Sequence, residues 1–307
     1  MSGKIAFMFP GQGSLELGMG RDIAEAVPEA MAVVDAGSEV SGLDLRALLF
    51  ESSIEDLVDT EVQQPVLVTA SLAIEEAIRA RGIHPDYVIG HSVGEFAALA
   101  AADTLSVRDA IALVRERWLA MAAAARERPG AMAAILGLAD EVVEALCQKI
   151  HEVWPANYNC PGQLVISGAS PAVDEACAEA EREGARRAIK LRVSGAFHSP
   201  LVAHAAERLK PAIEKAQFSL PHSEFMSTVT AKLEDAQRHR ELLLEQLTAP
   251  VRFTQAATEL IQQGVTVFVE VGPGNVLSGL LKRIDRGVKA IPVNNLKALN
   301  GLEDAVG

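Results

Sequence analysis

Residues 90–95 read Gly-His-Ser-Val-Gly-Glu and contain the pattern G-x-S-x-G. This pattern is the sequence form of a nucleophile elbow, a sharp turn from strand into helix that glycines permit and that lifts a serine hydroxyl, here Ser92, clear of the backbone. The pattern alone occurs by chance in roughly one chain in ten of this length. Its context is more specific, because residues 86–89 predict a short buried strand and residues 93–102, rich in alanine and leucine, predict a helix.

Strands and helices alternate on both sides of this elbow. Alternation of this kind predicts an α/β fold with a central, mainly parallel sheet, and the elbow makes the fold hydrolase-like. The strands that we expect are residues 4–9, 86–89, 224–228 and 265–271. The helices that we expect are residues 28–42, 64–81, 93–102, 107–128, 200–216, 241–247, 254–263 and, last in the chain, 275–285.

Residues 128–194 follow a different order of elements. The expected order is strand, helix, strand, strand, helix, strand, which is the ferredoxin-like βαββαβ arrangement. The elements are residues 130–138, 140–150, 153–159, 163–167, 171–184 and 187–193. We therefore expect a small ferredoxin-like domain at residues 128–194, inserted in a large α/β domain formed by residues 1–127 and 195–307.

The composition excludes several classes of protein. With 307 residues, 49% hydrophobic and 22% charged, the chain is long enough for one large or two modest globular domains. We expect no membrane span and no signal peptide, because no apolar stretch is long enough and the N-terminus lacks a basic-then-apolar pattern. The cysteines, Cys147, Cys160 and Cys177, lack metal-ligand spacing and predict a reduced, cytoplasmic protein. The net charge of −13 argues against wholesale nucleic-acid binding.

A serine hydroxyl needs a base to remove its proton before it becomes a good nucleophile. Among the seven histidines, His198 follows a predicted strand and precedes a Ser-Pro pair that suits the start of a helix. Loops at strand ends are where α/β enzymes place catalytic groups, so His198 is a candidate base. His91 adjoins Ser92 and is expected to point elsewhere, and His239 lies among charged residues and is expected to be exposed. The remaining histidines are assigned to loops or structural positions: His84, His151, His204 and His222.

Several motifs spread along the chain carry a family resemblance. They are FPGQGS at residues 9–14, QP at 64–65, GHSVGE at 90–95, Arg117, NYN at 157–159, PGQ at 161–163, GAFHS at 195–199 and EVGPG at 270–274. In this order and over nearly the whole chain, including the inserted small domain, the set resembles the malonyl-CoA:acyl carrier protein transacylase family.

The resemblance implies the catalytic groups. Ser92 corresponds to the nucleophile that becomes malonylated, and His198 to the general base and later acid. In this family a main-chain carbonyl, here that of Gln246, holds the second nitrogen of the histidine, so a Gln246→Ala substitution is expected to be mild. The backbone N–H groups of Gln12 and Val93 correspond to the oxyanion hole. The local sequence agrees, because glycines flank Gln12 and Val93 begins the helix after the elbow, where N–H groups are free.

Arg117 corresponds to the arginine that binds the malonyl carboxylate, for which a charged guanidinium fork is suited. Two residues depart from the family: Trp118 stands where a glycine is usual, and Thr228 where many relatives have asparagine. Without the resemblance, a surface salt bridge would be the more common role for Arg117, although its place in an otherwise apolar helix face favours a buried one. The resemblance also implies further substrate-binding positions, which are His91, Phe197, Gln64, Asn159 and Gln163.

Phe197 bears on specificity, and Asn159 and Gln163 each have a second interpretation. The ring of Phe197 would crowd a methyl branch and so favour malonyl over methylmalonyl. Asn159 and Gln163 could instead belong to ordinary turns.

These assignments imply an acyl carrier protein S-malonyltransferase that works in two steps. Malonyl-CoA acylates Ser92 and releases CoA, and the phosphopantetheine thiol of holo-acyl carrier protein then takes the malonyl group, for fatty-acid or polyketide synthesis. We expect no cofactor or metal beyond these substrates, no nucleic-acid or membrane partner, and a monomer. The elbow alone also fits a serine hydrolase of esterase or lipase type, an acyltransferase for another extender unit, or a non-catalytic carrier-binding module. Arg117 and the inserted domain favour the transferase.

Overall fold

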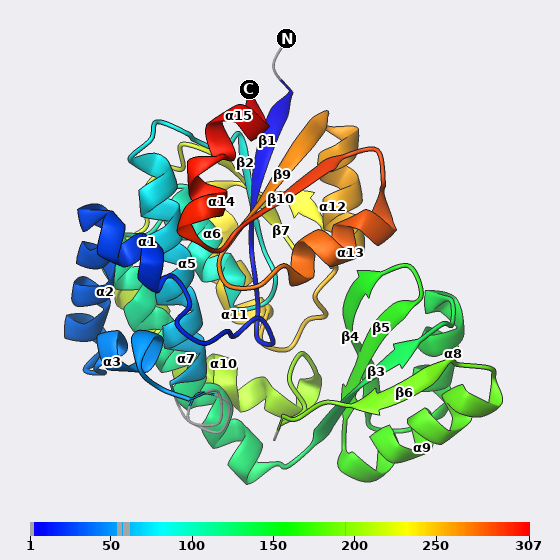
Figure 1. The fold of residues 1–307 in the computed structure, drawn as a ribbon. Coiled ribbons are helices and arrows are strands. Elements are labelled where there is room, and N and C mark those ends of the chain that lie inside the picture. The colour runs from blue at the N-terminus through cyan, green and yellow to red at the C-terminus, as the bar shows by residue number, and fades with distance from the viewer. Residues whose placement is uncertain (1–2, 54–56, 58–61, 194) are drawn as a thin grey trace.

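The computed structural model in Figure 1 describes residues 3–53, 57, 62–193 and 195–307. The strands of its larger sheet are β1 Lys4–Phe9, β2 Tyr87–Gly90, β7 Glu224–Ser227, β8 Lys232–Leu233, β9 Val265–Val271 and β10 Lys289–Val293. Their order across the sheet is β10-β9-β1-β2-β7-β8, and neighbours are parallel except for β7 and β8. The predicted α/β fold with a central, mainly parallel sheet is confirmed.

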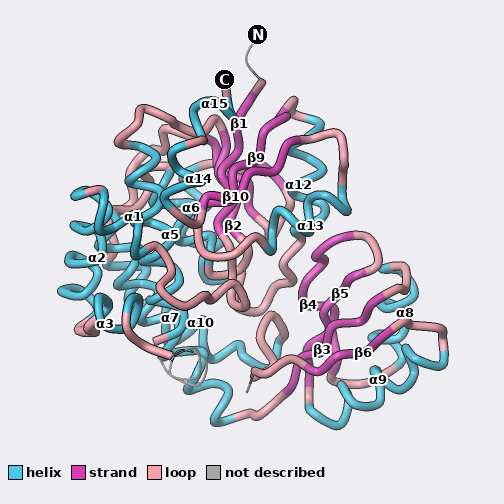
Figure 2. The backbone as a smooth tube through the Cα atoms, viewed as in Figure 1, coloured by secondary structure: helices cyan, strands magenta, loops and turns pink. Residues whose placement is uncertain are grey.

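Each face of this sheet is covered by its own helices (Figure 2). Successive side chains of a strand leave on opposite faces. Phe7 and Phe9 of β1 therefore pack in one core with α1, α2, α5, α6 and α7, while Ala6 and Met8 pack in a second with α12 and α13. The bounds of these helices are α1 Arg21–Ala26, α2 Pro28–Ser41, α5 Gln63–Arg79, α6 Gly94–Ala101, α7 Val107–Glu127, α12 Phe253–Gln262 and α13 Val276–Ile284. Three further helices are α3 Leu45–Phe50, α10 Ala203–Lys215 and α11 His239–Glu245.

The smaller sheet is antiparallel and lies beside the larger one in Figure 1. Its elements are β3 Ala131–Leu136, α8 Asp140–Lys149, β4 Val153–Cys160, β5 Gln163–Gly168, α9 Ser170–Arg182 and β6 Arg187–Lys190. The strand order β4-β5-β3-β6 is that of a ferredoxin-like βαββαβ unit, as predicted. The division into domains at residues 1–127, 128–194 and 195–307 stays a prediction, and residue 194 lies outside the described residues.

The C-terminal part of the chain differs from the prediction. The helix expected at residues 275–285 is α13, but it is not the last element, because β10, α14 (Leu296–Asn300) and α15 (Leu302–Val306) follow it. β10 lies at the edge of the sheet and contains Pro292, which has no N–H to donate. Proline is confined to such edge positions, and it weakens the strand signal in the sequence.

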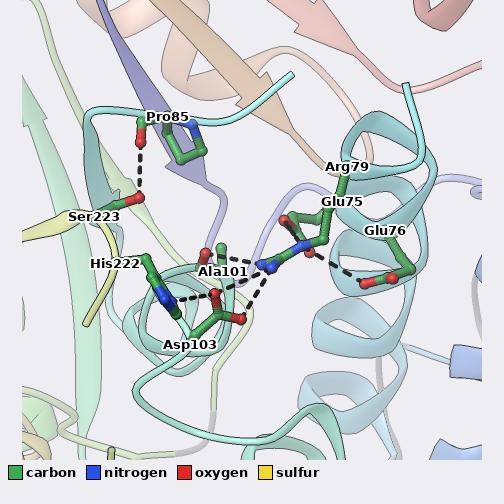
Figure 3. A network of polar contacts seen from close by, with 8 residues as sticks. All are labelled: Glu75, Glu76, Arg79, Pro85, Ala101, Asp103, His222 and Ser223. Carbon is green, nitrogen blue, oxygen red and sulfur yellow. Dashed lines mark hydrogen bonds and ion pairs between the residues drawn. The ribbon is translucent and has the colours of Figure 1, made fainter. Parts of the chain in front are cut away.

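A polar network ties helices together at the end of the sheet where β2 and β7 begin (Figure 3). Arg79 of α5 donates from Nε to Glu75 Oε1 at 3.2 Å and from Nη1 to Asp103 Oδ1 at 3.0 Å. Its Nη2 donates to the carbonyl oxygen of Ala101 at 3.1 Å, and Nδ1 of His222 lies 2.8 Å from Asp103 Oδ2. Ser92 follows β2, so this network lies at the opposite end of the sheet and bears on stability.

Candidate active site

The elbow places Ser92 at the carboxyl end of β2, between Gly90 and the start of α6 at Gly94. A Cβ atom at Gly90 would lie 2.1 Å from the backbone nitrogen of Glu95, and one at Gly94 would lie 2.2 Å from the carbonyl oxygen of Phe9. Only glycine fits at these two positions. Ser92 itself has φ 54°, in the left-handed region that non-glycine residues rarely adopt. The sharp turn predicted from G-x-S-x-G is therefore present, with strain at the serine.

His198 faces this serine from the loop before α10. Its Nε2 lies 2.8 Å from Ser92 Oγ, while its Nδ1 lies 2.8 Å from the carbonyl oxygen of Gln246 and 3.1 Å from that of Ala249. Because carbonyl oxygens only accept hydrogen bonds, Nδ1 carries the proton and Nε2 can accept from the serine hydroxyl. The backbone N–H of His198 donates to the carbonyl of Leu247 at 3.1 Å, so a single loop holds both the ring and the backbone.

The imidazole of His198 is uncharged at neutral pH. Burial lowers its pKa to about 3, and the positive charge of Arg117 and the neighbouring His91 act in the same direction. The two carbonyl contacts at Nδ1 oppose this shift but do not overcome it. A neutral imidazole is the form that can take a proton from Ser92.

Arg117 lies next to the serine, fully buried on α7. Its Nη2 donates to Ser92 Oγ at 3.1 Å and to Gln246 Oε1 at 3.0 Å. Its Nη1 donates to Gln64 Oε1 at 2.6 Å, and its Nε has no hydrogen-bond partner among the described residues. Burial lowers its pKa to about 9, an effect that the charge of Glu95 opposes, so the guanidinium stays charged near neutral pH. A buried cation with an unused donor beside the nucleophile suits an anionic group.

A cavity of about 140 Å³ opens in front of Ser92 between the two sheets. This volume is far below the roughly 300–1,000 Å³ of sites for drug-sized ligands, so it suits a short acyl group and not a nucleotide. The singled-out residues that line it are Gln12, Gln64, His91, Ser92, Val93, Asn159, Phe197 and His198. The lining residues for which no role was predicted are Met121, Met132, Asn157, Val165, Leu191 and Val193. All but Asn157 are apolar, and three of the apolar residues lie on a helix or strand, where their sequence pattern is that of ordinary core positions.

Gln12 and Val93 reach this cavity from two separate loops. A Cβ atom at Gly11 would lie 2.6 Å from the carbonyl oxygen of His91, so the loop after β1 runs against the backbone of the elbow. Both residues therefore flank Ser92, as an oxyanion hole requires. Their role as donors stays a prediction.

Three predicted site residues are absent from the lining of this cavity as the described chain forms it. Arg117 and Gln246 are buried behind it, where they contact Ser92 and His198 respectively. Gln163 lies at the turn between β4 and β5, and its Oε1 accepts a hydrogen bond from Arg283 Nη1 at 3.0 Å. A contact between Gln163 and substrate stays a prediction.

Two other histidines were given expectations by the sequence. His91 was expected to point away from the serine, and its Nε2 lies 2.9 Å from Asn159 Oδ1 on β4, while its ring lines the same cavity. The prediction that His239 is exposed was wrong, because the residue is fully buried. Its ring packs edge-on against Phe225 at 5.1 Å and its Nε2 donates to the carbonyl of Glu234, so tertiary packing overrides the charged local sequence.

Two kinds of feature are absent from the described ranges of the chain. No group of three or more histidine, cysteine or acidic side chains there is arranged to hold a metal ion. No helix in those ranges is both long enough and apolar enough to cross a bilayer.

Known proteins resemble this chain over nearly its full length. Residues 6–298 match the family described as acyl transferase domain. The malonyl CoA-acyl carrier protein transacylase of Bacillus subtilis (strain 168) is 44% identical over 297 residues, which cover 95% of this chain and 94% of that protein. The enzyme of the same name from Haemophilus influenzae is 39% identical over 307 residues, with 98% of both chains covered.

Solved structures agree with these relatives. The malonyl-CoA:acyl carrier protein transacylase of Xanthomonas oryzae superposes with a TM-score of 0.94 at 41% identity, covering 99% of this chain and 98% of that one. A malonyl-transacylase in complex with its type II PKS acyl-carrier protein also superposes with a TM-score of 0.94, at 38% identity and with 98% and 99% of the two chains covered.

Proposed function

We propose, since this chain belongs to the malonyl CoA-acyl carrier protein transacylase family, that it transfers a malonyl group from malonyl-CoA to the phosphopantetheine thiol of an acyl carrier protein. The observation that carries the proposal is the 2.8 Å contact between Ser92 Oγ and His198 Nε2, with the Arg117 guanidinium 3.1 Å from the same oxygen. A nucleophile, its base and a buried cation thus meet at one point.

In the first half-reaction, Ser92 is acylated. His198 Nε2 takes the hydroxyl proton while Oγ forms a bond to the thioester carbonyl carbon, and the oxyanion is held by the N–H groups of Gln12 and Val93. When the tetrahedral intermediate collapses, the carbon–sulfur bond breaks and the CoA sulfur leaves with the proton from His198. The second half-reaction repeats these steps in reverse order, with the carrier thiol as attacking group and Ser92 as leaving group.

Arg117 is proposed to bind the carboxylate of the malonyl group. Its Nη2 is shared between Ser92 Oγ and Gln246 Oε1, and its Nε has no partner among the described residues. A carboxylate at this position would accept a hydrogen bond from the free Nε of Arg117. It would also replace Ser92 Oγ as the partner of Nη2, since that contact is lost once the serine is acylated. An arginine that binds a carboxylate in this way favours a substrate with a second acid group over a plain acyl chain.

The remaining assignments concern the surroundings of this site. We propose that Gln64, His91, Asn159 and Phe197 line the space for the acyl group, while the rest of CoA lies outside the cavity. The acyl carrier protein as partner is supported by the related complex. From the sequence we also propose a cytoplasmic monomer that needs no cofactor or metal beyond its two substrates. Fatty-acid and polyketide synthesis both use such a product.

The test is covalent labelling of Ser92. After incubation with malonyl-CoA, mass spectrometry of the intact protein and its peptides should find one malonyl group, on the peptide that contains Ser92. Ser92→Ala should fold and take up none. The label should persist in buffer and leave when holo-acyl carrier protein is added. Loss of the label to water without carrier protein would instead mean a hydrolase, and labelling of another peptide would refute the assignment of Ser92.

A further inference from the structure

Glu95 is a buried carboxylate that the transfer steps above do not use. It lies in the first turn of α6, next to the elbow, and its side chain is fully buried. Its Oε1 accepts hydrogen bonds from the backbone N–H of Thr228 at 2.7 Å and from Thr228 Oγ1 at 2.9 Å, with Ser227 Oγ at 3.4 Å. Its Oε2 accepts from Gln246 Nε2 at 2.8 Å. Burial raises its pKa to about 7, against the effect of these donors and of Arg117.

Gln246 connects this carboxylate to both functional groups of the site. Its side-chain oxygen accepts from Arg117 Nη2 at 3.0 Å, and its main-chain oxygen accepts from His198 Nδ1 at 2.8 Å. A side-chain amide has one donor end and one acceptor end. Because Arg117 only donates, it requires the oxygen of the Gln246 amide, and the amide NH2 group then faces Glu95 Oε2, which accepts from it.

The amide also separates two buried charges. A carboxylate in direct contact with Arg117 would form an ion pair and compete with an acidic substrate for the guanidinium. A neutral amide oxygen fixes the position of the guanidinium and leaves its charge for the substrate. Thr228, one of the two departures from the family, holds Glu95 with both its N–H and its hydroxyl.

We propose that Glu95 is a positioning residue that holds the Gln246 side chain with its oxygen toward Arg117, and thereby fixes the guanidinium for the carboxylate of the acyl group. This inference rests on the proposed malonyl transfer. It differs from the expectation that Gln246 acts only through its main-chain carbonyl. It predicts that the side chains of Glu95 and Gln246 serve selectivity for malonyl, while acyl groups without a carboxylate are transferred almost independently of them.

The experiment compares the rates at which Ser92 is acylated by malonyl-CoA and by acetyl-CoA, measured by rapid quench and mass spectrometry. Glu95→Gln keeps the size of the side chain but presents an amide donor to the Gln246 donor, so the Gln246 amide loses its enforced orientation. We expect malonylation to slow by at least about tenfold, the effect of one hydrogen bond to a charged group, and acetylation by less than about threefold. Equal slowing with both thioesters, or no slowing, would overturn the proposal.

A matched control and a second variant keep the test decisive. Glu270 is also fully buried at the carboxyl end of a strand, and it accepts from the backbone N–H groups of Leu277 and Ser278, away from Arg117. Glu270→Gln should leave the ratio of malonyl to acetyl rates within about twofold, as expected for a change outside the network. Gln246→Met removes the amide at similar shape and should reproduce the selective loss even if Glu95→Gln fails to fold.

The double variant tests whether Glu95 acts through Gln246. In the Gln246→Met background, Glu95→Gln should change the ratio of the two rates by less than about twofold, because the link is already absent. A full further loss in that background would overturn the proposal. Failure of the wild-type protein to take up malonyl at all would instead refute the proposed function, so the two failures are distinguishable.

Discussion

Arg117 has opposite effects on the two partners of the proton transfer. Its Nη2 donates to Ser92 Oγ, which stabilises negative charge developing on that oxygen. Burial is the larger cause of the low pKa of His198, and the positive charge of Arg117 lowers it further, which makes the imidazole a weaker base. Because His198 is then neutral at every pH near neutrality, the enzyme keeps its whole population of base available. His198 is therefore a weaker base, but it is in the neutral form that can accept the proton of Ser92.

Arg117→Ala should therefore change both selectivity and pH dependence. Loss of a charged partner costs about 2–5 kcal/mol in a desolvated site, so the ratio of malonyl to acetyl kcat/KM should fall at least about 30-fold. Removal of the positive charge should raise the pKa of His198. The acid limb of the pH profile, measured with acetyl-CoA, should therefore move to higher pH than in the wild type.

The measurement is kcat/KM for both thioesters from about pH 3, the wild-type pKa of His198, up to about pH 8, with circular dichroism to confirm folding. An equal loss with the two thioesters would mean that Arg117 supports the structure and does not bind the carboxylate. An acid limb that stays in place or moves down would mean that its charge does not act on His198.

Single residues differ in how far the sequence could predict them. Ser92 lies in a local pattern whose glycines are required by backbone clearance, so its geometry follows from six consecutive residues. The partners of Glu95 lie at residues 227–228 and 246, far away in the chain, and no local pattern relates them. Long-range side-chain contacts of this kind arise only from the assembled fold.

At the scale of elements, α7 carries both Arg117 and a residue that supports the wall of the cavity. The indole of Trp118 lies 6.5 Å from the ring of Phe197, centroid to centroid, and it does not line the cavity formed by the described residues. A Cβ atom at Gly195 would lie 2.7 Å from Phe197 Cε1 and 2.9 Å from Ala125 Cβ. Phe197 is thus packed between the loop backbone and the face of α7 that bears Trp118.

Trp118→Ala should loosen this wall. Space behind Phe197 would let its ring retreat, so methylmalonyl transfer should rise relative to malonyl transfer by about fivefold, or about 1 kcal/mol, the lower end of what one methyl group is worth in a pocket. The free energy of unfolding should fall by about 2 kcal/mol, less than for a fully buried tryptophan, because Trp118 is half-buried. The ratio of kcat/KM for the two thioesters checks this. Trp118→Phe keeps a ring and should retain the wild-type ratio; an unchanged ratio in Trp118→Ala would contradict the role of α7.

At the other end of the sheet, Arg79 offsets the charge of Glu75 (Figure 3). The Glu75 side chain is 3% exposed, and burial raises its pKa from 4.5 to about 7 in spite of Arg79. The unfolded chain loses this proton at lower pH than the folded chain does. Stability contributed by protonated Glu75 is therefore lost as the pH rises between about 4.5 and 7.

Arg79→Ala should destabilise the fold in a pH-dependent way. At about pH 8 the wild-type Glu75 is ionised and paired, so loss of the partly exposed Arg79 should cost about 2 kcal/mol. At about pH 5 the protonated carboxyl needs no cation, and the cost should be less than half as large. Urea unfolding at both pH values measures the difference. In a Glu75→Gln background the cost of Arg79→Ala should be the same at both pH values; a pH dependence that persists there would assign the effect to another group.

At the scale of the whole molecule, the site is formed by two sheets that meet along β4. The backbone N–H of Tyr158 donates to the carbonyl of Val251 at 2.8 Å, and that of Val251 donates to the carbonyl of Ala156 at 2.8 Å. The strand that carries Asn157 and Asn159 to the cavity is therefore hydrogen-bonded to the chain just beyond the loop that holds His198. Movement of the smaller sheet would therefore act on both the asparagines of β4 and the loop that holds His198.

The order of strands and helices was sufficient to predict both the α/β fold with its mainly parallel sheet and the βαββαβ unit. It could not predict the order of strands, because a pairing such as β1 with β9 joins residues more than 250 positions apart, for example Lys4 with Val265. It also missed β10 and the short helices after it, since a five-residue edge strand with a proline has little periodic signal. The cavity in front of Ser92 depends on these distant pairings. Its lining residues were therefore predicted only at positions that the family resemblance assigns.

Arg283 of α13 holds the tip of the smaller sheet from the other side. It donates to the carbonyl of Pro161 at 2.9 Å and to Gln163 Oε1 at 3.0 Å, at the turn between β4 and β5. Arg283→Ala should release this turn at a cost of about 1 kcal/mol, since both contacts are exposed, and so speed amide exchange there by about fivefold. The neighbouring Lys282 provides a control that removes the same charge from the same helix.

The consequence for function follows from β4. A looser turn lets Asn159 move relative to His91, so KM for malonyl-CoA should rise by about twofold to fivefold in Arg283→Ala, while kcat should change less, because Ser92 and His198 belong to the larger sheet and its loops. Hydrogen exchange resolved by peptide and steady-state kinetics measure the two effects. Lys282→Ala should show neither. If both variants raise KM equally, the positive charge of the helix contributes to substrate binding, and the hydrogen bonds of Arg283 to the turn between β4 and β5 do not explain the rise in KM.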